Sequence, residues 1–305
     1  MGHVPPDSAK SEPWTITRLL AWTTPFLKQR DIDSPRLSAE ILLAHALKCD
    51  RIELYTRHDA VPDQSALGSF RENVRKASEG APIAYLIGYK EFYSARFTVN
   101  EHVLIPRPET EMLVERTISL ARNSTEPVHR ILEIGAGSGC IAICIALHLP
   151  GAQVSASDIS GEALAVAQQN AEQHGVIDRI DFRQGDLFAP WDGHEPFDVI
   201  VSNPPYIAQA DAARLPANVR DFEPATALFA GDDGLSVLRS LIGGAPARLR
   251  DNGHLLTEMA FDQAAGVRNL LDASVWGDIV TYKDMAQHER VLHARRLAAG
   301  STQVA

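Results

Sequence analysis

The fold of this chain is decided by the stretch Ile131-Leu132-Glu133-Ile134-Gly135-Ala136-Gly137-Ser138-Gly139. Its first four residues are mostly branched and apolar, which is typical of a buried strand in a parallel sheet. The three glycines that follow let the backbone approach a ligand at the mouth of that strand. An apolar run begins at Cys140 and predicts a helix. The stretch therefore predicts a strand, a ligand-binding turn and a helix, as in an open α/β sheet.

Strand and helix patterns alternate from residue 130 onward, which indicates an α/β fold built on a parallel sheet. Further strands are expected at residues 154–157, 180–182, 197–202 and 254–258, with two last strands at residues 279–282 and 291–294. Apolar or amphipathic segments predict helices at residues 140–149, 162–174, 234–250 and 263–271.

Before the sheet, residues 1–80 are expected to form a small helical bundle. Apolar positions recur with helical spacing in residues 16–26, after Ser34-Pro35, and again after Pro62-Asp63. A serine hydroxyl followed by proline is typical of a capped helix start. The apolar positions of that second helix are Leu37, Ile41, Ala44 and Leu47. Because no titratable cluster in this domain suggests chemistry, we expect it to dock a protein partner.

Gly80-Ala81-Pro82 breaks the helical pattern, and residues 81–110 are expected to form a hairpin linker. Its two strands are predicted at residues 83–85 and 97–99. The prolines near the end of the linker restrict an extended loop that carries Arg107 and Glu109. From the residues alone, this loop fits a plain connector and a wall of an active site equally well.

A second informative stretch is Phe197-Asp198-Val199-Ile200-Val201-Ser202-Asn203-Pro204-Pro205-Tyr206. Its apolar run predicts a buried strand, and its prolines lack an N–H, so the turn presents carbonyl oxygens with few competing donors. Asn203 adds a side-chain oxygen, and Tyr206 adds a flat ring with a polar tip. A rigid acceptor cluster at the carboxyl end of a strand suits a planar amino group, whose two N–H donors need two acceptors.

The glycine-rich turn predicts a nucleoside site without a diphosphate. A dinucleotide fingerprint requires glycine at position 140, where this chain has Cys140, and the turn has no Gly-Lys-Ser/Thr sequence. Asp158 follows about 20 residues further on, where a carboxylate can accept hydrogen bonds from both hydroxyls of a ribose. Asp186, at the end of the third strand, is expected within reach of an adenine amino group.

Composition narrows the classes of function. The 305 residues include 29 Lys and Arg against 39 Asp and Glu, a net charge of −10, so general binding of DNA or RNA is disfavoured. The three cysteines show no metal-binding spacing, and an odd, low count fits a reducing cytosol. The N-terminus has no signal-peptide core, and the longest apolar run, residues 140–147, is far shorter than the ~20 residues that span a membrane. We therefore expect a cytoplasmic protein that holds no metal, and we expect it to be a monomer.

Taken together, these motifs resemble those of the release-factor glutamine methyltransferase family (HemK/PrmC), which are S-adenosylmethionine-dependent enzymes. The resemblance runs from about residue 33 to residue 295. It is carried by residues 33–37 with 39–40, 82–85, 91–93, 104–111, 133–143, 201–207, 223–224, 227–228 and 231–235. The chain departs from the usual family glycine at three positions outside these motifs, namely Ser94, Ala260 and Gln287.

The resemblance implies a seven-stranded Rossmann-like methyltransferase sheet in residues 111–305, behind the helical docking domain and the hairpin linker. The cofactor contacts that it implies are Gly135, Ala136, Gly137, Ser138, Gly139, Asp158 and Leu187. Two further residues, Asp186 and Asn203, are also expected to contact the cofactor. The resemblance also implies that a glutamine amide of the Gly-Gly-Gln motif in class I peptide release factors is held by Asn203, Pro204, Pro205 and Tyr206. The partners expected are therefore the release factors, with no nucleic acid bound directly.

The expected chemistry follows from the residue types. An amide nitrogen is a poor nucleophile, because its lone pair is delocalised into the carbonyl group. Asn203 Oδ1 and the Pro204 carbonyl are expected to accept its two N–H bonds, while Tyr206 packs on the flat amide. Three alternatives stay open: a ribosomal-protein glutamine methyltransferase, an adenine-N6 methyltransferase acting on a flipped base, and an inactive cofactor-binding module. The acidic balance counts against the second, and the intact Asn-Pro-Pro-Tyr sequence counts against the third.

Overall fold

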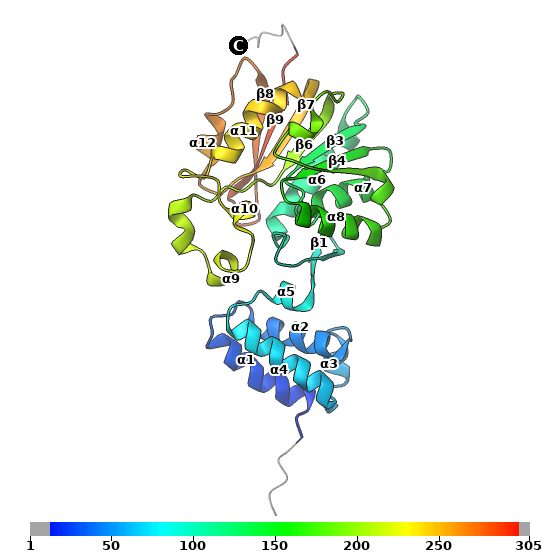
Figure 1. Ribbon diagram of the computed structural model, residues 1–305, viewed down its shortest axis with the longest axis vertical. Helices are drawn as coiled ribbons and strands as arrows, with labels where there is room; N and C mark the ends of the chain where they lie inside the picture. The colour runs from blue at the N-terminus through cyan, green and yellow to red at the C-terminus, as the bar shows by residue number, and fades with distance from the viewer. Residues whose placement is uncertain (1–12, 299–305) are drawn as a thin grey trace, which may run out of the picture. The chain divides into compact units, whose positions relative to one another are not determined.

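The computed structural model describes residues 13–298, which divide into two compact units between Ile87 and Gly88 (Figure 1). Expectations for residues 1–12 and for the last residues of the chain lie outside the described part. Within residues 13–298, no helix has both the length and the apolar character that are needed to cross a membrane.

The first unit is a helical bundle, as predicted. Its helices are α1 (Ile16–Lys28), α2 (Pro35–Leu47), α3 (Glu53–Thr56), α4 (Gln64–Ser78) and α5 (Ile83–Ile87). Asp63 caps α4, since its carboxylate accepts a hydrogen bond from Ala66 N at 2.8 Å. Leu67, Phe70 and Val74 of α4 face the core, as their spacing predicts.

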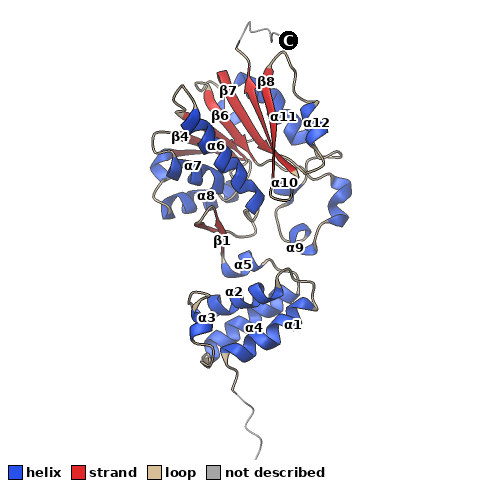
Figure 2. Cartoon of the chain, turned by 180° about the vertical axis from the view of Figure 1, so that it is seen from behind, coloured by secondary structure: helices blue, strands red, loops and turns tan. Residues whose placement is uncertain are grey.

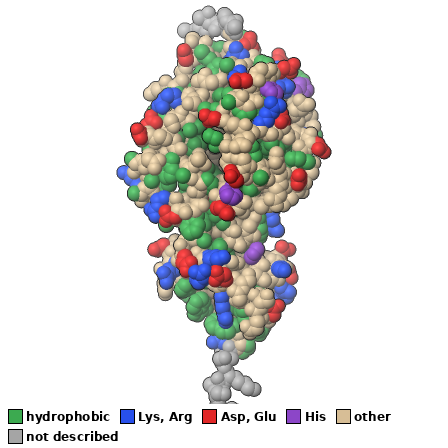
Figure 3. Space-filling view, in the orientation of Figure 1, with side chains coloured by type: hydrophobic (Ala, Val, Ile, Leu, Met, Phe, Trp, Pro, Cys, Tyr) green, Lys and Arg blue, Asp and Glu red, His purple; other side chains and the backbone are tan. Residues whose placement is uncertain are grey.

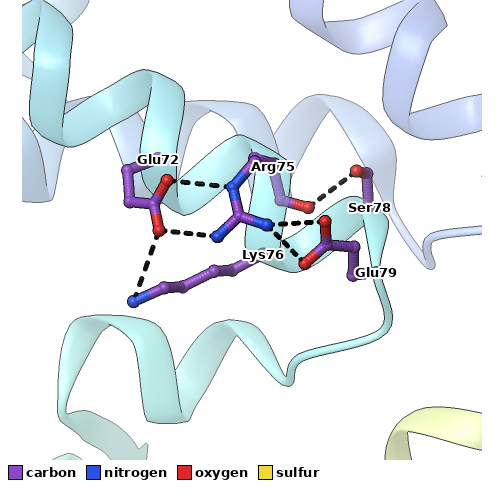
Figure 4. Close-up of polar contacts among 5 residues, drawn as sticks. All are labelled: Glu72, Arg75, Lys76, Ser78 and Glu79. Carbon is purple, nitrogen blue, oxygen red and sulfur yellow. Dashed lines mark hydrogen bonds and ion pairs between the residues drawn. The ribbon is translucent and has the colours of Figure 1, made fainter.

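The exposed face of α4 is charged and self-paired (Figure 4). Arg75 contacts Glu72 at 2.7 Å and Glu79 at 2.6 Å, one turn before and one turn after it. These carboxylates raise the pKa of the Arg75 guanidinium, and Arg75 lowers the pKa of Glu72. Exposed pairs of this kind contribute little to stability. We therefore assign this charge cluster to helix solvation and not to chemistry.

Two details of the first unit differ from the sequence predictions. Ser34 adopts a left-handed conformation with φ 47° and makes no capping hydrogen bond, although Pro35 does begin α2. The buried face of α2 carries Leu42 and Leu43, whereas Leu37 is 39% exposed. The spacing of apolar residues does not reveal this face, because the face includes the polar Glu40. The Glu40 carboxylate is buried and accepts hydrogen bonds from Arg36 and from the Tyr55 hydroxyl, each at 2.6 Å.

The predicted strand at residues 83–85 is wrong, because these residues belong to helix α5. Pro82 lies just before α5, and its carbonyl accepts hydrogen bonds from Tyr85 N and Leu86 N, while Ile83 packs against the helical core. The hairpin does exist, but it comes later, as β1 (Tyr89–Phe92) paired antiparallel with β2 (Ala95–Thr98). The helical unit therefore extends to Ile87, beyond the expected boundary at residue 80.

The second unit is built on a seven-stranded sheet, which confirms the α/β prediction. Its strands are β3 (Arg130–Ile134), β4 (Gln153–Asp158), β5 (Ile180–Gln184), β6 (Phe197–Ser202), β7 (Leu249–Glu258), β8 (Trp276–Lys283) and β9 (Glu289–Arg296). The strand order is β5-β4-β3-β6-β7-β9-β8, and only β9 runs antiparallel to its two neighbours. Each of these strands overlaps a predicted one, although β7 begins at Leu249 and not near residue 254.

Helices cover both faces of the sheet, so its central strands are apolar on both sides (Figures 1 and 2). Val199 and Val201 of β6 pack against one helical layer, and Ile200 packs against the other. The first layer contains α6 (Glu111–Asn123), α7 (Cys140–His148) and α8 (Gly161–Gln173), and the second contains α11 (Ser236–Gly244) and α12 (Ala264–Arg268). The helix predicted at residues 234–250 ends early, where Pro246 lies in a short 3-10 turn before β7.

Between β6 and α11 the chain makes a long excursion over residues 203–235. It contains a 3-10 segment at Gln209–Arg214 and the short helices α9 (Ala217–Arg220) and α10 (Ala225–Leu228). Further 3-10 segments lie at Pro108–Thr110, Ile177–Arg179, Ala189–Trp191 and Ala245–Ala247. From β3 the chain first adds β4 and β5 on one side of the sheet and then continues with β6 on the other side, so the strand order reverses at β3. In such sheets ligands bind at the carboxyl ends of the strands beside this point.

The three departures from family glycines lie in loops. Ser94 has φ 61° in the two-residue hairpin turn, and Gln287 has φ 65° between β8 and β9. Both are left-handed conformations, in which glycine has no steric penalty. Ala260 follows β7, and its N–H donates to Gln263 Oε1 at 3.1 Å.

Candidate active site

A cavity of about 320 Å³ lies at the carboxyl ends of the central strands of the second unit. One part of its lining comes from the ends of β3 to β6 and the turns after them, within residues 133–141, 157–160, 185–187 and 202–205. The other part comes from residues 102–110 and from the excursion, at residues 224–229. Its volume is within the range of small-molecule sites.

The glycine-rich turn has the backbone geometry that its sequence predicts. Gly135, Gly137 and Gly139 have φ of 79°, 53° and 78°, so all three occupy the region that favours glycine. Gly139 is not among the residues that line the cavity; a Cβ there would meet Ala167 Cβ and Ile143 Cδ1 at 3.0 Å. Its role is close packing of α7, whereas Gly135, Ala136, Gly137 and Ser138 line the cavity.

Asp158 ends β4 and holds this turn in place. Its Oδ2 accepts a hydrogen bond from Gly137 N at 2.8 Å, and its Oδ1 accepts one from Ser160 N at 2.9 Å. Burial raises the pKa of Asp158, although these backbone N–H groups act in the opposite direction. A carboxylate has about four acceptor positions. Asp158 therefore retains acceptor capacity toward the cavity that it lines.

Glu133 is a cavity residue that the sequence analysis did not single out. It is 1% exposed, and its Oε2 accepts a hydrogen bond from Ala142 N, in the first turn of α7, at 2.9 Å. Its Oε1 has no hydrogen-bond partner among the described residues, and burial raises its pKa well above the usual value. The available signal was an acidic residue inside an otherwise apolar strand that leads into the glycine-rich turn.

Asp186 and Leu187 follow β5 and line the cavity. Leu187 has φ 46°, a conformation that is unusual for a residue with a branched side chain, and Asp186 is exposed at the rim. Asn170 of α8 was also missed. Its amide group donates to the Ser138 carbonyl at 2.8 Å and accepts from Thr98 N at 2.7 Å, so it ties the glycine-rich turn to the hairpin.

The Asn-Pro-Pro-Tyr turn is divided between the cavity and the core. Asn203, Pro204 and Pro205 line the cavity, whereas Tyr206 packs against the apolar cluster beneath α11 and α12 and is not a lining residue. The Tyr206 hydroxyl donates to Glu258 Oε1 at 3.2 Å, and burial beside that carboxylate raises the pKa of Tyr206. The structure therefore does not bring the Tyr206 ring to the place where packing on a substrate amide was expected.

Asn203 begins a chain of hydrogen bonds that runs through Thr110, which also lines the cavity, to the buried Glu258. Asn203 Nδ2 donates to Thr110 Oγ1 at 3.0 Å, and Thr110 Oγ1 donates to Glu258 Oε2 at 2.7 Å. Neither Thr110 nor Glu258 was predicted as a site residue. Their pairing spans 148 positions along the chain, so no local pattern marks it.

Arg107, whose role the sequence left open, lines the cavity and forms an ion pair with Glu223 at 2.5 Å. The same buried carboxylate accepts a hydrogen bond from Ile105 N at 3.1 Å. These contacts fasten the loop at residues 104–110 to the excursion, so two walls of the cavity are held together. Glu109 is exposed beside them.

Elsewhere in residues 13–298 there is no group of three or more His, Cys, Asp or Glu side chains that could hold a metal ion. Cys140 and Cys144 are buried thiols of α7, and burial raises both of their pKa values, that of Cys144 to about 12. At neutral pH they are therefore protonated and unreactive.

Comparison with known proteins places this geometry in context. Residues 18–88 match the PrmC N-terminal domain, and residues 110–221 match the methyltransferase small domain. The release factor glutamine methyltransferase of Rhodopirellula baltica is 47% identical over 294 residues, which cover 95% of this chain and 99% of that protein. That of Chlorobaculum tepidum is 43% identical over 286 residues, covering 92% and 96%.

Among solved structures, the catalytic domain of hMettl16 in complex with the MAT2A 3′UTR hairpin 6 has a TM-score of 0.55 at 17% identity. The match covers 76% of this chain and 84% of that chain. At this level of identity the likeness concerns the fold alone.

Proposed function

The chain belongs to the release factor glutamine methyltransferase family, and we propose that it methylates the side-chain amide nitrogen (N5) of the glutamine in the Gly-Gly-Gln motif of class I peptide release factors, using S-adenosylmethionine. The observation that carries this proposal is the placement of Asn203, Pro204 and Pro205 in the same cavity as Asp158 and the glycine-rich turn. One cavity thus offers acceptors for an amide beside a site for a nucleoside.

The residues of the cavity fit S-adenosylmethionine. Asp158 has acceptor capacity left for ribose hydroxyls, and Asp186 lies at the rim for an adenine amino group. Glu133 offers a buried oxygen without a partner, which suits an ammonium group. When bound, the cofactor supplies a methyl group on a sulfonium, a strong electrophile that needs no metal. We propose that the cofactor also contacts residues 135–138 of the glycine-rich turn, Leu187 and Asn203, all of which line the cavity.

The protein's own contribution is to position the amide. The Asn203 side-chain oxygen and the Pro204 carbonyl accept the two N–H bonds of the substrate glutamine, which orients the nitrogen and favours the positive charge that develops on it. Preorganised acceptors of this kind act mainly through positioning and electrostatics. A bound cofactor would supply the methyl group to the oriented nitrogen and would be left as a neutral thioether, and the extra amide proton would leave to solvent. Tyr206 supports this turn from the core side through its bond to Glu258.

The helical unit is proposed to dock the release factor. It exposes large apolar side chains, including Trp22, which is 54% exposed and stacks on Phe26 at 5.1 Å between ring centroids. Exposed apolar groups that gather on one unit are typical of a surface that binds a protein partner. Because the proposed substrate is a translation factor, we propose that the enzyme acts in the cytoplasm. We also propose that it acts as a monomer.

A methyl-transfer assay with purified release factor, followed by mass-spectrometric mapping, tests the proposed function. Label is expected on the glutamine of the Gly-Gly-Gln motif, and a release factor with Gln→Asn at that position should stay unlabelled, because the shorter side chain withdraws the amide from its acceptors. Adenine-containing DNA and RNA serve as the comparison under identical conditions. Acidic side chains lie among the basic ones on the face drawn in Figure 3, so phosphate binding is disfavoured there. Label on nucleic acid and none on the release factor would overturn the proposal.

A further inference from the structure

We propose that Glu258, acting through Thr110, is a positioning residue that holds the Asn203 carboxamide with its oxygen directed to the substrate amide. This inference rests on the proposed function, because it concerns how the acceptor for the glutamine is oriented. The hydrogen bonds that link Asn203, Thr110 and Glu258 are called the orienting chain below.

Three separate segments bring the orienting chain together. Ser202 of β6 pairs with Thr257 of β7, so the residues that follow them, Asn203 and Glu258, lie side by side at the carboxyl ends of the two strands. Thr110 ends the 3-10 segment that precedes α6. Thr110 is 3% exposed and Glu258 is 1% exposed, so water does not compete for the hydrogen bonds between them.

The direction of each hydrogen bond follows from the chemistry of Glu258. An ionised carboxylate only accepts, so the single hydroxyl proton of Thr110 is donated to Glu258 Oε2 at 2.7 Å. Thr110 Oγ1 can then only accept from Asn203, and the group of Asn203 at 3.0 Å must be its NH2. The Asn203 oxygen is left for the cavity.

Without this constraint, Asn203 could turn its amide over at little cost, since the oxygen and the nitrogen have nearly the same shape. The NH2 group would then meet the NH2 group of the substrate glutamine, and two donors would face each other. The orienting chain therefore selects the one rotamer of Asn203 that can accept. Both oxygens of Glu258 accept a hydrogen bond, since the second oxygen accepts from the Tyr206 hydroxyl at 3.2 Å.

A merely structural role for Thr110 predicts something different. In that case, removal of the hydroxyl would loosen the cavity as a whole and would weaken cofactor binding together with the rate. An orienting role predicts a loss in kcat with cofactor binding retained, and it predicts that serine at position 110, which keeps the hydroxyl, preserves the rate.

The test compares Thr110→Val with Thr110→Ser in the full-length enzyme, with release factor as substrate and S-adenosylhomocysteine affinity measured by calorimetry. Thr110→Val keeps the shape of the side chain and should lower kcat by about 10-fold or more, while affinity changes by less than about twofold. Thr110→Ser should stay within about threefold of the wild type. Equal rates for Thr110→Val and the wild type, or an equally slow Thr110→Ser, would overturn the inference.

A double-mutant cycle tests whether Glu258 acts through Thr110. Glu258→Leu removes the acceptor of the Thr110 proton, so it should lower kcat about as much as Thr110→Val, and the double variant should be no slower than either single variant. Losses that multiply would overturn the coupling. If Glu258→Leu does not fold, the pH profiles of the wild type and Thr110→Val decide: a low-pH loss that Thr110→Val abolishes supports the coupling, and an identical loss in both overturns it.

The failure of this inference is distinguishable from that of the proposed function. An inactive wild type on release factor would refute the proposed function. An active wild type, an inactive Asn203→Ala and a fully active Thr110→Val would refute only the orienting chain.

Discussion

The carboxylate of Asp158 accepts a hydrogen bond from the backbone N–H of Gly137 at 2.8 Å, so the end of β4 fixes the turn that follows β3. A single side chain thereby serves two tasks, since it shapes the glycine-rich turn and keeps acceptor positions for a ligand. This arrangement explains why an aspartate about 20 residues after the turn is informative in such folds.

Asp158→Ala should weaken binding of S-adenosylmethionine by roughly 1.5–3 kcal/mol, as expected for the loss of hydrogen bonds to a charged group. The loss includes any loosening of the turn at Gly137. Calorimetry on the purified variant provides the measurement. The matched control is Asp178→Ala, an exposed aspartate of a 3-10 segment that does not line the cavity. Equal affinities for both variants and the wild type would remove Asp158 from the cofactor site.

Asn203→Ala should leave cofactor affinity nearly intact and lower the transfer rate by about 100-fold, by analogy with the loss of one preorganised hydrogen-bonding group. The physical reason is that the substrate amide loses one of its two acceptors and its orientation. Single-turnover measurements with release factor report the rate without product release. Asn269→Ala, an exposed position after α12, is the control and should behave as the wild type. A cofactor affinity that falls in step with the rate would argue for a structural role.

Residues 88–305 alone should bind S-adenosylmethionine but methylate intact release factor poorly. All cavity residues lie in the second unit, whereas the exposed apolar residue Trp22 lies in the first. The measurement is kcat/KM for intact release factor, with a short Gly-Gly-Gln peptide as the control substrate. The shortened and the full-length enzyme should treat the peptide alike. A shortened enzyme with full kcat/KM on intact release factor would exclude a docking role for the helices.

Much of the second unit could be predicted from the sequence, because its signals are local. A strand such as Phe197–Ser202, buried on both faces, has a continuous apolar pattern, and the glycine-rich turn requires positive φ angles that glycine provides. Local patterns also explain why Asp158 and Asn203 lie at one cavity. The strands that precede them, β4 and β6, both pair in parallel with β3, so their carboxyl ends meet at one edge of the sheet.

The missed features depend on contacts between residues far apart in the sequence. Glu40 is polar but buried, because Arg36 and Tyr55 satisfy its carboxylate, so apolar spacing could not locate the inner face of α2. Thr110 and Glu258 form a pair only after the sheet has folded. An acidic residue inside or at the end of a buried strand is nevertheless a signal that sequence analysis can use, as Glu133 and Glu258 respectively show.

Ser94→Gly should raise the free energy of unfolding by about 0.5 kcal/mol, because relief of the left-handed conformation outweighs the larger entropy that glycine gives the unfolded chain. Tyr93 and Ser94 form the two-residue turn between β1 and β2 with φ of 48° and 61°. Both positive angles are typical of a turn that favours glycine. Urea unfolding monitored by circular dichroism measures the change. Ser240→Gly, in the exposed interior of α11, is the opposite control and should destabilise.

The last prediction concerns pH and follows from the burial of Glu258. Desolvation raises its pKa to about 7, while hydrogen bonds from Thr110 and Tyr206 and the nearby Arg290 act against this rise and Glu109 adds to it. Only the ionised carboxylate fixes the Thr110 proton, so kcat should fall as the pH is lowered through about 7. The folded-state pKa lies above that of the unfolded chain. The stability that Glu258 contributes is therefore fully present below its unfolded pKa and is lost as the pH rises through about 7.

Activity and stability should thus change in opposite directions across neutral pH. Single-turnover rates with saturating cofactor, and melting temperatures of the same samples, give both curves. Thr110→Val is the control, because it separates Asn203 from Glu258. Its rate should lack the low-pH loss, whereas its stability should still rise as the pH falls, since Glu258 stays buried. A wild-type rate that is constant from about pH 5.5 to 8.5, despite a stability curve that reports the ionisation, would show that Glu258 titrates without controlling the orientation of Asn203.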